Sequence, residues 1–411
     1  MGVMTGTEAR PVPAPLPGLW TFWVDRYISP GVFEPAGPVT ATSFNCIRRL
    51  SGYGTGDIII VAETSSLTRP ELLRLWGWRL WAYFAGQPVW CGMPNGLTDD
   101  GRAVISFTLS EVTGYLRKRQ WDLAGQYGVL TGGPPATHRR YDQVEQVAIA
   151  RDLAAPVADV GVSITTSQGP GFPRDRNYAF LESESRAQLL VNLAGVIEGP
   201  EFRTSYYTGN DGLPRAELTI AFPRVGSDLP GLGATVPGTA MDYTLKWDAD
   251  MFRTRTYAVG EQPESVDGVE QPKISHMTDR PQPGFPRLDE VDDWPGVTVP
   301  ATLAERAESN ATIYASPTLD ASVTVPAIQP PYGTYGPGDT VHLMITGPMQ
   351  PDGIDIEGRL TELSVNARES RCGWTVSVTE PPGQPRQTLI QQLASLRRLT
   401  TGVFRWGVSP G

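Results

Sequence analysis

Segment 76–121 has the clearest pattern of hydrophobic and polar positions in the chain. Aromatic residues suited to a half-buried pleated surface fill its first runs, and turns containing glycine or polar residues separate the runs. Strands are therefore expected at 78–84, 88–93 and 102–109. Ser110 is placed to cap a short helix in which Val112, Tyr115 and Leu116 form one apolar face. The pattern predicts a small sheet with a helix leaving its end.

The same alternation recurs along the chain and predicts further strands, at 20–27, 43–50, 57–62, 202–207, 216–222, 244–247, 253–259, 338–345, 356–365 and 373–379. The turn signal 209–212 makes two of them a hairpin. Gly52, Gly54 and Gly56 lead into a strand. A phosphate-binding loop would instead open a helix, so these glycines are interpreted as a turn.

Helical periodicity is confined to a few segments. Asp142 and Glu145 match a capping box, which predicts a helix through Leu153 that ends before Pro156. Other helical segments are expected at 68–73, 185–194 and about 303–310. Thr388 can cap a terminal helix whose apolar stripe requires a packing partner; the stripe consists of Leu389, Leu393, Leu396 and Leu399.

The order of these elements predicts a β-rich α+β chain of several domains. Residues 1–18 alternate proline with other residues and are expected to form an extended arm. The predicted domains are a first β-barrel domain at 19–117, an inserted α+β domain at 118–310, a second β-barrel domain at 311–384, and a C-terminal helix and tail at 385–411. Within the inserted domain, the acidic, proline-rich segment 261–300 is interpreted as a surface excursion or linker of low order.

Composition supports the β-rich assignment and narrows the function. The 411 residues include 44 glycines and 38 prolines, which favours a protein rich in turns. The net charge of −10 argues against binding to nucleic acid or to an anionic membrane, because both need a positive field. We find no signal segment and no apolar run of membrane-spanning length, so no membrane span is expected.

Residues that could carry chemistry are scattered. Cys46, Cys91 and Cys372 lie far apart and are interpreted as buried small hydrophobes, while no C-x-x-C pair occurs. The histidines are isolated from one another: His138 is expected in a loop, His342 in a strand, and His276 stands alone. No metalloprotease, serine-hydrolase or Walker motif is present. We therefore assign no catalytic, cofactor-binding or metal-binding residue, and no cofactor.

Two residue classes leave alternatives open. Paired carboxylates could serve glycoside hydrolysis, although surface and turn positions explain them equally simply; they are Asp248 with Asp250, and Asp352 with Asp355 and Glu357. Four tyrosines could stack on sugars or simply pack against strands; they are Tyr206, Tyr207, Tyr332 and Tyr335.

The shared order of several segments resembles the hub-type minor tail proteins of actinobacterial siphophages, which are related to baseplate hubs. The matching segments are 86–93, 109–121, 142–153, 190–202, 247–260 and 335–339 with 358–361. The resemblance implies two tail-tube-like β-barrel domains with an inserted α+β domain, and a homotrimer at the tail tip of the virion. It implies no catalytic residue.

The resemblance also implies a set of partners. These are the distal tail protein, the tail tube, the tape measure protein and other tail-tip or fibre proteins, with DNA passing through the channel without specific binding. The expected role is structural: joining the tail tube to the tip, closing the channel before infection, and taking part in host attachment and genome ejection. A tail-associated cell-wall hydrolase and a receptor-binding module for host glycans are the alternatives.

Overall fold

A computed structural model describes residues 19–99, 104–120, 138–169, 171–179, 185–195, 199–260, 274–294, 300–315, 318–328, 332–347 and 350–377. These residues form two compact units. Unit 1 contains the described residues of 1–243 and 322–376, and unit 2 contains those of 244–321 together with Ser377. The boundaries fall inside strands β14 (Asp242–Asp248) and β18 (Thr318–Pro326).

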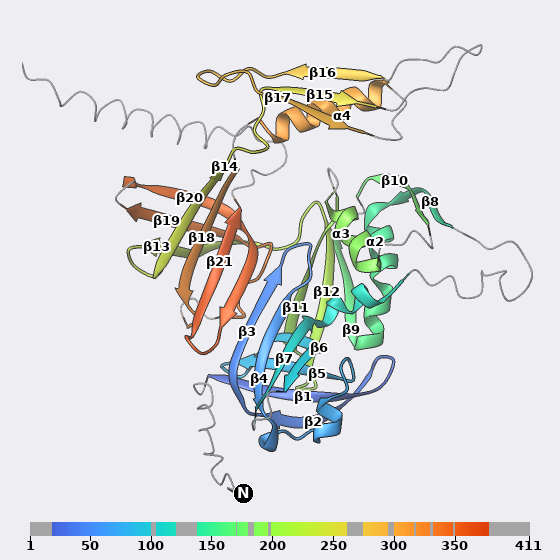
Figure 1. The fold of residues 1–411 in the computed structure, drawn as a ribbon, viewed down its shortest axis with the longest axis vertical. Coiled ribbons are helices and arrows are strands. Elements are labelled where there is room, and N and C mark those ends of the chain that lie inside the picture. Colours follow the sequence, from blue (N-terminus) through green and yellow to red (C-terminus); the bar gives the residue numbers. More distant parts are fainter. Residues whose placement is uncertain are drawn as a thin grey trace, which may run out of the picture. The chain divides into compact units, whose positions relative to one another are not determined.

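The N-terminal part of unit 1 is an antiparallel sheet in the order β3-β4-β7-β6-β5-β1-β2 (Figure 1). Its strands are β1 (Trp20–Ser29), β2 (Val32–Val39), β3 (Ala41–Arg49), β4 (Thr55–Val61), β5 (Trp78–Phe84), β6 (Gln87–Asp99) and β7 (Val104–Glu111). β2 and β3, the two ends of this order, are separated in sequence by Thr40 alone. The one-turn helix α1 (Arg69–Leu72) begins at a capping box between Thr68 and Glu71.

Aromatic side chains fill the buried face of this sheet. The rings of Trp20 and Phe84 lie 4.9 Å apart, and those of Phe44 and Trp90 lie 5.6 Å apart. Trp90 fits because Gly92 has no side chain: a Cβ there would lie 2.0 Å from the indole ring. A few large rings therefore supply much of the apolar area that this face buries.

The second sheet of unit 1 contains β18, β21 (Arg371–Ser377), β20 (Gln350–Asn366), β19 (Thr340–Gly347) and β13 (Asp228–Val236), in that order. β20 is 17 residues long. Its first part pairs with β19, and its last part pairs antiparallel with β3, where Leu363 faces Arg48. One strand therefore belongs to both sheets.

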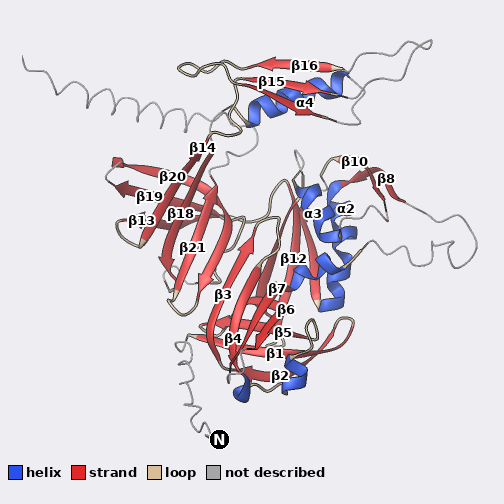
Figure 2. Ribbon diagram, viewed as in Figure 1, coloured by secondary structure: helices blue, strands red, loops and turns tan. Residues whose placement is uncertain are grey.

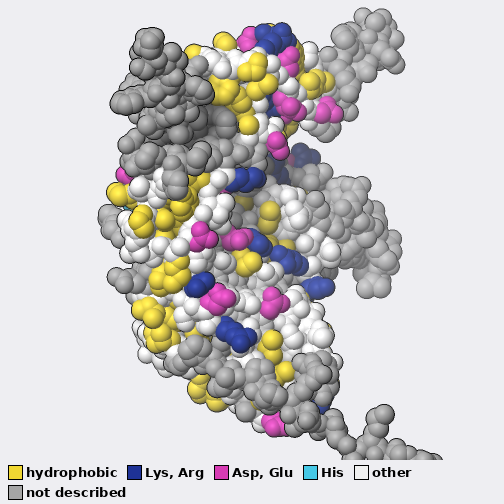
Figure 3. Space-filling view, turned by 60° about the vertical axis from the view of Figure 1, so that its left-hand side comes forward, with side chains coloured by type: hydrophobic (Ala, Val, Ile, Leu, Met, Phe, Trp, Pro, Cys, Tyr) yellow, Lys and Arg dark blue, Asp and Glu magenta, His cyan; other side chains and the backbone are white. Residues whose placement is uncertain are grey.

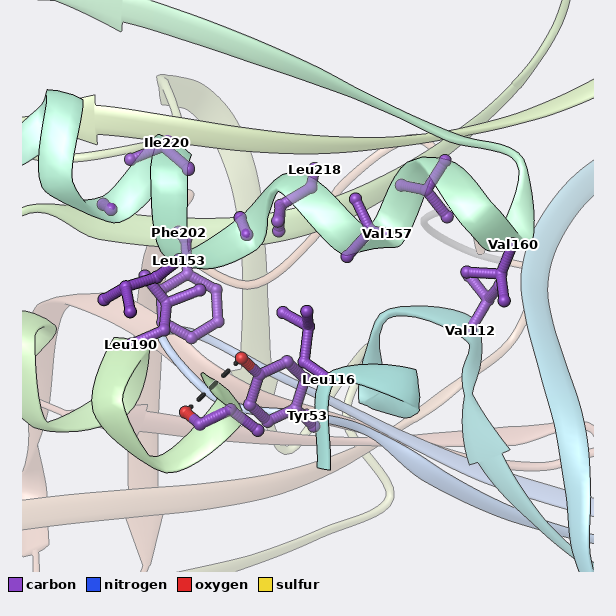
Figure 4. Close-up of a cluster of buried hydrophobic side chains, with 14 of the residues drawn as sticks. Tyr53, Val112, Leu116, Leu153, Val157, Val160, Leu190, Phe202, Leu218 and Ile220 are labelled. Carbon is purple, nitrogen blue, oxygen red and sulfur yellow. Dashed lines mark hydrogen bonds between the residues drawn. The ribbon is translucent and has the colours of Figure 1, made fainter. Parts of the chain in front are cut away.

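A mixed region packs beside the first sheet. Strands β11 (Glu201–Thr208), β12 (Pro214–Phe222) and β9 (Val162–Gln168) form a sheet, and β8 (His138–Glu145) pairs with β10 (Pro173–Ala179). Helices α2 (Gln146–Ala154) and α3 (Arg186–Ala194) and the 3₁₀ segments η2 (Val112–Lys118) and η3 (Ala155–Val160) join them in one buried core, part of which Figure 4 shows. In this core Leu153, Leu190 and Phe202 converge from two helices and a strand.

Unit 2 is a small α/β element. Strands β16 (Ser275–Asp279), β15 (Arg255–Val259) and β17 (Asp289–Asp293) form its sheet, and α4 (Pro300–Ile313) packs against it through Leu303 and Ala307 (Figure 2). Arg253 is buried beside this sheet, donates to Asp292 Oδ1 at 2.8 Å and lies over the Tyr314 ring.

The structure confirms the predicted β-rich fold with few helices. The expected strands are all present, although β2, β8, β9, β10, β13, β16, β17 and β18 were not predicted. The strand pairing among the described residues is open and forms no closed ring, so the two barrels stay a prediction. The boundaries of the predicted domains also stay predictions, and the N-terminal arm and C-terminal helix lie outside the described residues.

Three expectations about local structure were wrong. The helix expected from Asp142 begins only at Gln146, because residues 138–145 pair with β10 as a strand. The helix expected after Ser110 is 3₁₀, and Ser110 itself ends the pairing of β7 with β4. Within 261–300, the described residues include strands β16 and β17, which pair with β15 on either side.

The physical reason for the last correction is charge pairing. Asp279 and Asp292 form ion pairs with Arg255 and Arg253, so two carboxylates of the acidic segment are paired with arginines that lie next to them only after folding. Acidic, proline-rich composition is typical of chains that stay unfolded, but that rule assumes unpaired charge.

We predict that Gly92→Ala lowers the free energy of unfolding by about 1–3 kcal/mol, because the added methyl must displace the Trp90 ring. Urea unfolding followed by tryptophan fluorescence measures the change. Gly195→Ala is the control, since its Cβ would make only ordinary contacts, with Val191 O at 3.4 Å and Asn192 O at 3.8 Å. Equal stabilities of the two variants would contradict the close packing at Trp90.

Candidate functional site

The residues that sequence considerations singled out do not come together. His138, His276 and His342 lie on three different strands, β8, β16 and β19, and His138 begins a strand where a loop was expected. His342 in a strand is confirmed. The three cysteines are buried and unpaired as disulfides, as predicted. Among the residues that the structure describes, no group of three His, Cys, Asp or Glu side chains could hold a metal ion.

The carboxylates and tyrosines take ordinary positions. Asp250, Asp355 and Glu357 are exposed, which agrees with surface positions. Tyr332 and Tyr335 are buried and pack against other rings, with Tyr335 5.1 Å from Trp374. Tyr207 is exposed, and Tyr206 is half-buried. Packing therefore explains three of the four tyrosines.

The most concentrated polar chemistry lies where β11 meets the second sheet of unit 1. We call this the polar junction, and it consists of Glu201 and Arg203 on β11, Asp339 before β19, and Arg359 on β20. Arg359 forms a two-pronged ion pair with Glu201, with Nη2 to Oε2 at 2.8 Å. Arg359 also donates to the carbonyls of Val225 and Gly338.

The second ion pair of the polar junction is equally well satisfied. Arg203 Nη1 donates to Asp339 Oδ1 at 2.8 Å. Asp339 is buried and also accepts from the backbone N–H groups of Ser227 and Gly336. Buried charges that have several hydrogen-bond partners fix the local geometry, because removing one partner leaves the charge of the other uncompensated. The polar junction therefore locks the register between β11, the segment before β19, and β20.

A buried carboxylate, Glu111, lies behind the polar junction. It accepts hydrogen bonds from the Tyr206 hydroxyl at 2.7 Å and from the N–H of Gly54 at 2.8 Å. The Arg48 guanidinium lies over the Tyr206 ring, 5.3 Å from its centroid. Burial raises the pKa of Glu111 above its usual value, although the hydrogen bonds from Tyr206 and Gly54 act in the opposite direction.

Chemically, these groups are held in place and already paired. A hydrolase needs a carboxylate or nucleophile facing an open cleft with a second group nearby. Instead, both carboxylate oxygens of Glu111 accept hydrogen bonds from donors within the protein, and so do those of Asp339. The described arrangement suits a structural joint.

The sequence held a weak signal for these groups. Arg48 occupies an inward position of the predicted strand 43–50, where alternation calls for an apolar residue, whereas Glu111 was expected in the helix after Ser110 and is buried at the end of β7. A charge at such a position indicates a buried polar partner, but the partners Thr204 and Tyr206 are more than 90 residues away from either of them. Only the fold brings these groups together.

The described residues form no surface patch of a single charge sign on the face that Figure 3 shows. In Figure 3 basic and acidic side chains are interspersed with hydrophobic ones. No described helix is both long enough and apolar enough to cross a bilayer.

Comparison with models of known protein families gave no match, and neither did comparison with curated protein sequences. Solved structures do match. The 43 kDa tail protein of prophage MuSo2 from Shewanella oneidensis aligns with a TM-score of 0.57 and 14% identity, over 88% of this chain and 98% of that protein. The tail protein from Neisseria meningitidis MC58 aligns with a TM-score of 0.53 and 14% identity, over 87% and 96%.

The chain has the fold of these two tail proteins. The predicted resemblance to phage tail proteins is thus confirmed for the fold. The narrower assignment to hub-type proteins of actinobacterial siphophages stays a prediction.

We expect Glu111→Gln to change how stability depends on pH. A carboxyl whose pKa is raised in the folded state binds its proton more tightly there than in the unfolded chain. The free energy of unfolding of the wild type should therefore fall, relative to that of Glu111→Gln, as the pH rises above the ordinary value of 4.5. Tyr206→Phe removes one donor that lowers the pKa and should make this fall larger. Parallel pH profiles for wild type and Glu111→Gln would refute the assignment.

Arg359→Met should cost about 2–3 kcal/mol of unfolding free energy, because it leaves the partly buried Glu201 carboxylate without its ion pair. Adding Glu201→Gln should restore part of the loss. The coupling energy from this double-mutant cycle can be compared with that of Arg49 and Glu362, a more exposed pair that also joins β20 to its neighbour. For that pair we expect less than about 1 kcal/mol. Equal couplings would contradict a locking role for the polar junction.

Proposed function

We propose that the protein is a structural component of a bacteriophage tail, a trimeric hub that joins the tail tube to the tip. The observation that carries the proposal is the match to a prophage tail protein over nearly the full length of both chains. A match of this extent covers most of both chains, so it concerns the architecture as a whole and not one module. That relative is described as a tail protein, and we infer the same role for this chain.

The arrangement of unit 1 supports a hub. Each chain carries two sheets that share β20; the first is antiparallel, and the second includes the parallel pair of β13 and β19. In the first sheet the two end strands, β2 and β3, are neighbours in sequence. Two similar modules in each of three chains would offer six positions to a sixfold tube. Fixed geometry between the modules is what such a ring requires, and the polar junction and β20 supply it.

Exposed apolar side chains near the β1–β2 turn support contacts with neighbouring chains. Ile28 and Val32 flank this turn, and both are exposed. Leu73 and Leu75 are also exposed and lie in the segment that ends at Gly77, whose carbonyl accepts from Tyr27 N–H at 3.1 Å. We call these four residues the hairpin patch. Apolar patches of this kind mark sites of protein association.

The remaining parts of the proposal follow from a tail location. The distal tail protein, the tail tube and the tape measure protein are the expected neighbours, with tip or fibre proteins below. The net charge of −10 would repel DNA rather than retain it in a channel. In this role the chain closes the channel before infection and needs no catalytic residue.

The oligomeric state tests the proposal. Native mass measurement of the full chain should give three times the chain mass of 44.6 kDa, and tail particles should contain three copies. Ile28→Asp with Val32→Asp should shift the chain toward monomer with unchanged circular dichroism, because charges in the hairpin patch oppose association. Leu213→Asp, equally exposed at the β11–β12 turn, is the matched control and should leave the trimer intact.

Other results would contradict the proposal. A copy number other than three in tail particles would exclude a trimeric hub. Lysis of purified cell walls, abolished by one Asp or Glu substitution, would favour a tail-associated hydrolase. Specific binding to a glycan array would favour a receptor-binding module.

A further inference from the structure

Arg48 is a buried cation without an ion pair. It is 5% exposed, and its Nη2 donates to the carbonyl of Thr204 at 2.8 Å. Its Nε has no hydrogen-bond partner, and no carboxylate among the described residues lies within ion-pair distance. Glu111 acts on it only at longer range, and both Glu111 oxygens already accept hydrogen bonds. A buried charge left in this condition is costly, so an additional anion would be favourable.

A pocket lies beside this guanidinium. Its volume is about 110 Å³, and its polar lining comprises Arg48, Arg203, Ser205, Tyr206, Thr334 and Asp339. Gly333 and Thr334 are exposed at its rim, whereas Arg48 is buried within it. The Nε of Arg203 also lacks a partner. The charge of Asp339 is already taken up by Arg203 and two backbone N–H groups, so the lining has one positive charge in excess.

Two glycines keep the pocket open. A Cβ on Gly336 would lie 3.2 Å from Arg48 Nη2, and a Cβ on Gly333 would lie 2.6 Å from Val89 Cγ1. Side chains at these positions would press on the guanidinium or on the wall of the pocket. The space beside Arg48 is therefore a consequence of residue choice in the 332–339 segment.

We propose that this pocket binds a single carboxylate group, with Arg48 as its ion-pair partner. A planar guanidinium matches the two oxygens of a carboxylate, and an ion pair would compensate the buried positive charge. A phosphate or sulfate would bring a second negative charge close to Asp339, which the single unpaired arginine could not balance. The carboxylate comes either from a small free acid or from an acidic side chain of another protein. The inference goes beyond the proposed function and does not depend on it.

The test uses the full chain and acetate as the probe, titrated at constant ionic strength against chloride. The Nε–Hε resonance of Arg48, assigned by its loss in Arg48→Met, should shift in a saturable way. Protection against thermal unfolding should rise with acetate in the wild type. In Arg48→Met the apparent Kd should increase about tenfold or more, the loss expected for a charge-assisted hydrogen bond. Arg49→Met, one residue along β3 and already paired with Glu362, should bind as the wild type does.

A second variant and a second ligand complete the test. Gly336→Ala keeps the charge of Arg48 but narrows the space beside it, so it should also weaken acetate binding. A blocked tripeptide with a central glutamate distinguishes the two sources of the carboxylate. If the tripeptide competes with acetate, the source is a protein side chain; if it does not compete, the source is a small free acid. The proposal is overturned if acetate gives no saturable shift, or if Arg48→Met and Gly336→Ala respond as the wild type does. A loss of acetate binding in Arg49→Met as large as that in Arg48→Met would also overturn it.

Discussion

Strand β20 is the constraint on which unit 1 depends. It pairs with β19 in one sheet and with β3 in the other, so neither sheet can shift its register without moving the other. A one-residue slip would turn every inward side chain outward. Along β20 the side chains of Leu360, Leu363 and Val365, which are now buried, would lose their packing contacts. The relation between the two sheets is therefore set by backbone pairing, which leaves little freedom between them.

The polar junction reinforces this pairing from a second direction. Arg359 projects from β20 to Glu201 on β11, and Arg203 on β11 reaches Asp339 before β19. Arginine suits these positions because its fork donates to a carboxylate and to backbone carbonyls at once. The chain contains three lysines among its 34 basic residues. Arginine-mediated joints of this kind recur in unit 2, where the buried Arg253 joins Asp292 to the Tyr314 ring.

Much of the fold could be predicted because most strands have a regular alternation of inward and outward residues. β5, with its aromatic run, and β7 were predicted to within two residues. Two of the strands that escaped prediction lack that pattern: β2 contains two prolines, and β9 is mostly exposed serine and threonine. Residues 142–145 were assigned to a helix because Asp142 and Glu145 mimic a cap, whereas they belong to a strand that pairs with β10.

The sequence by itself determined the β-rich class, the positions of most strands and helices, and the burial of the three cysteines, because these follow from local periodicity and side-chain polarity. The tertiary structure decided which charges meet. Glu111 and Tyr206, or Arg203 and Asp339, are separated by about 100 residues or more, and no local pattern encodes their contact. It also decided the pocket beside Arg48, since a cavity depends on how distant segments pack, and the space that Gly336 leaves has meaning only where a guanidinium lies opposite.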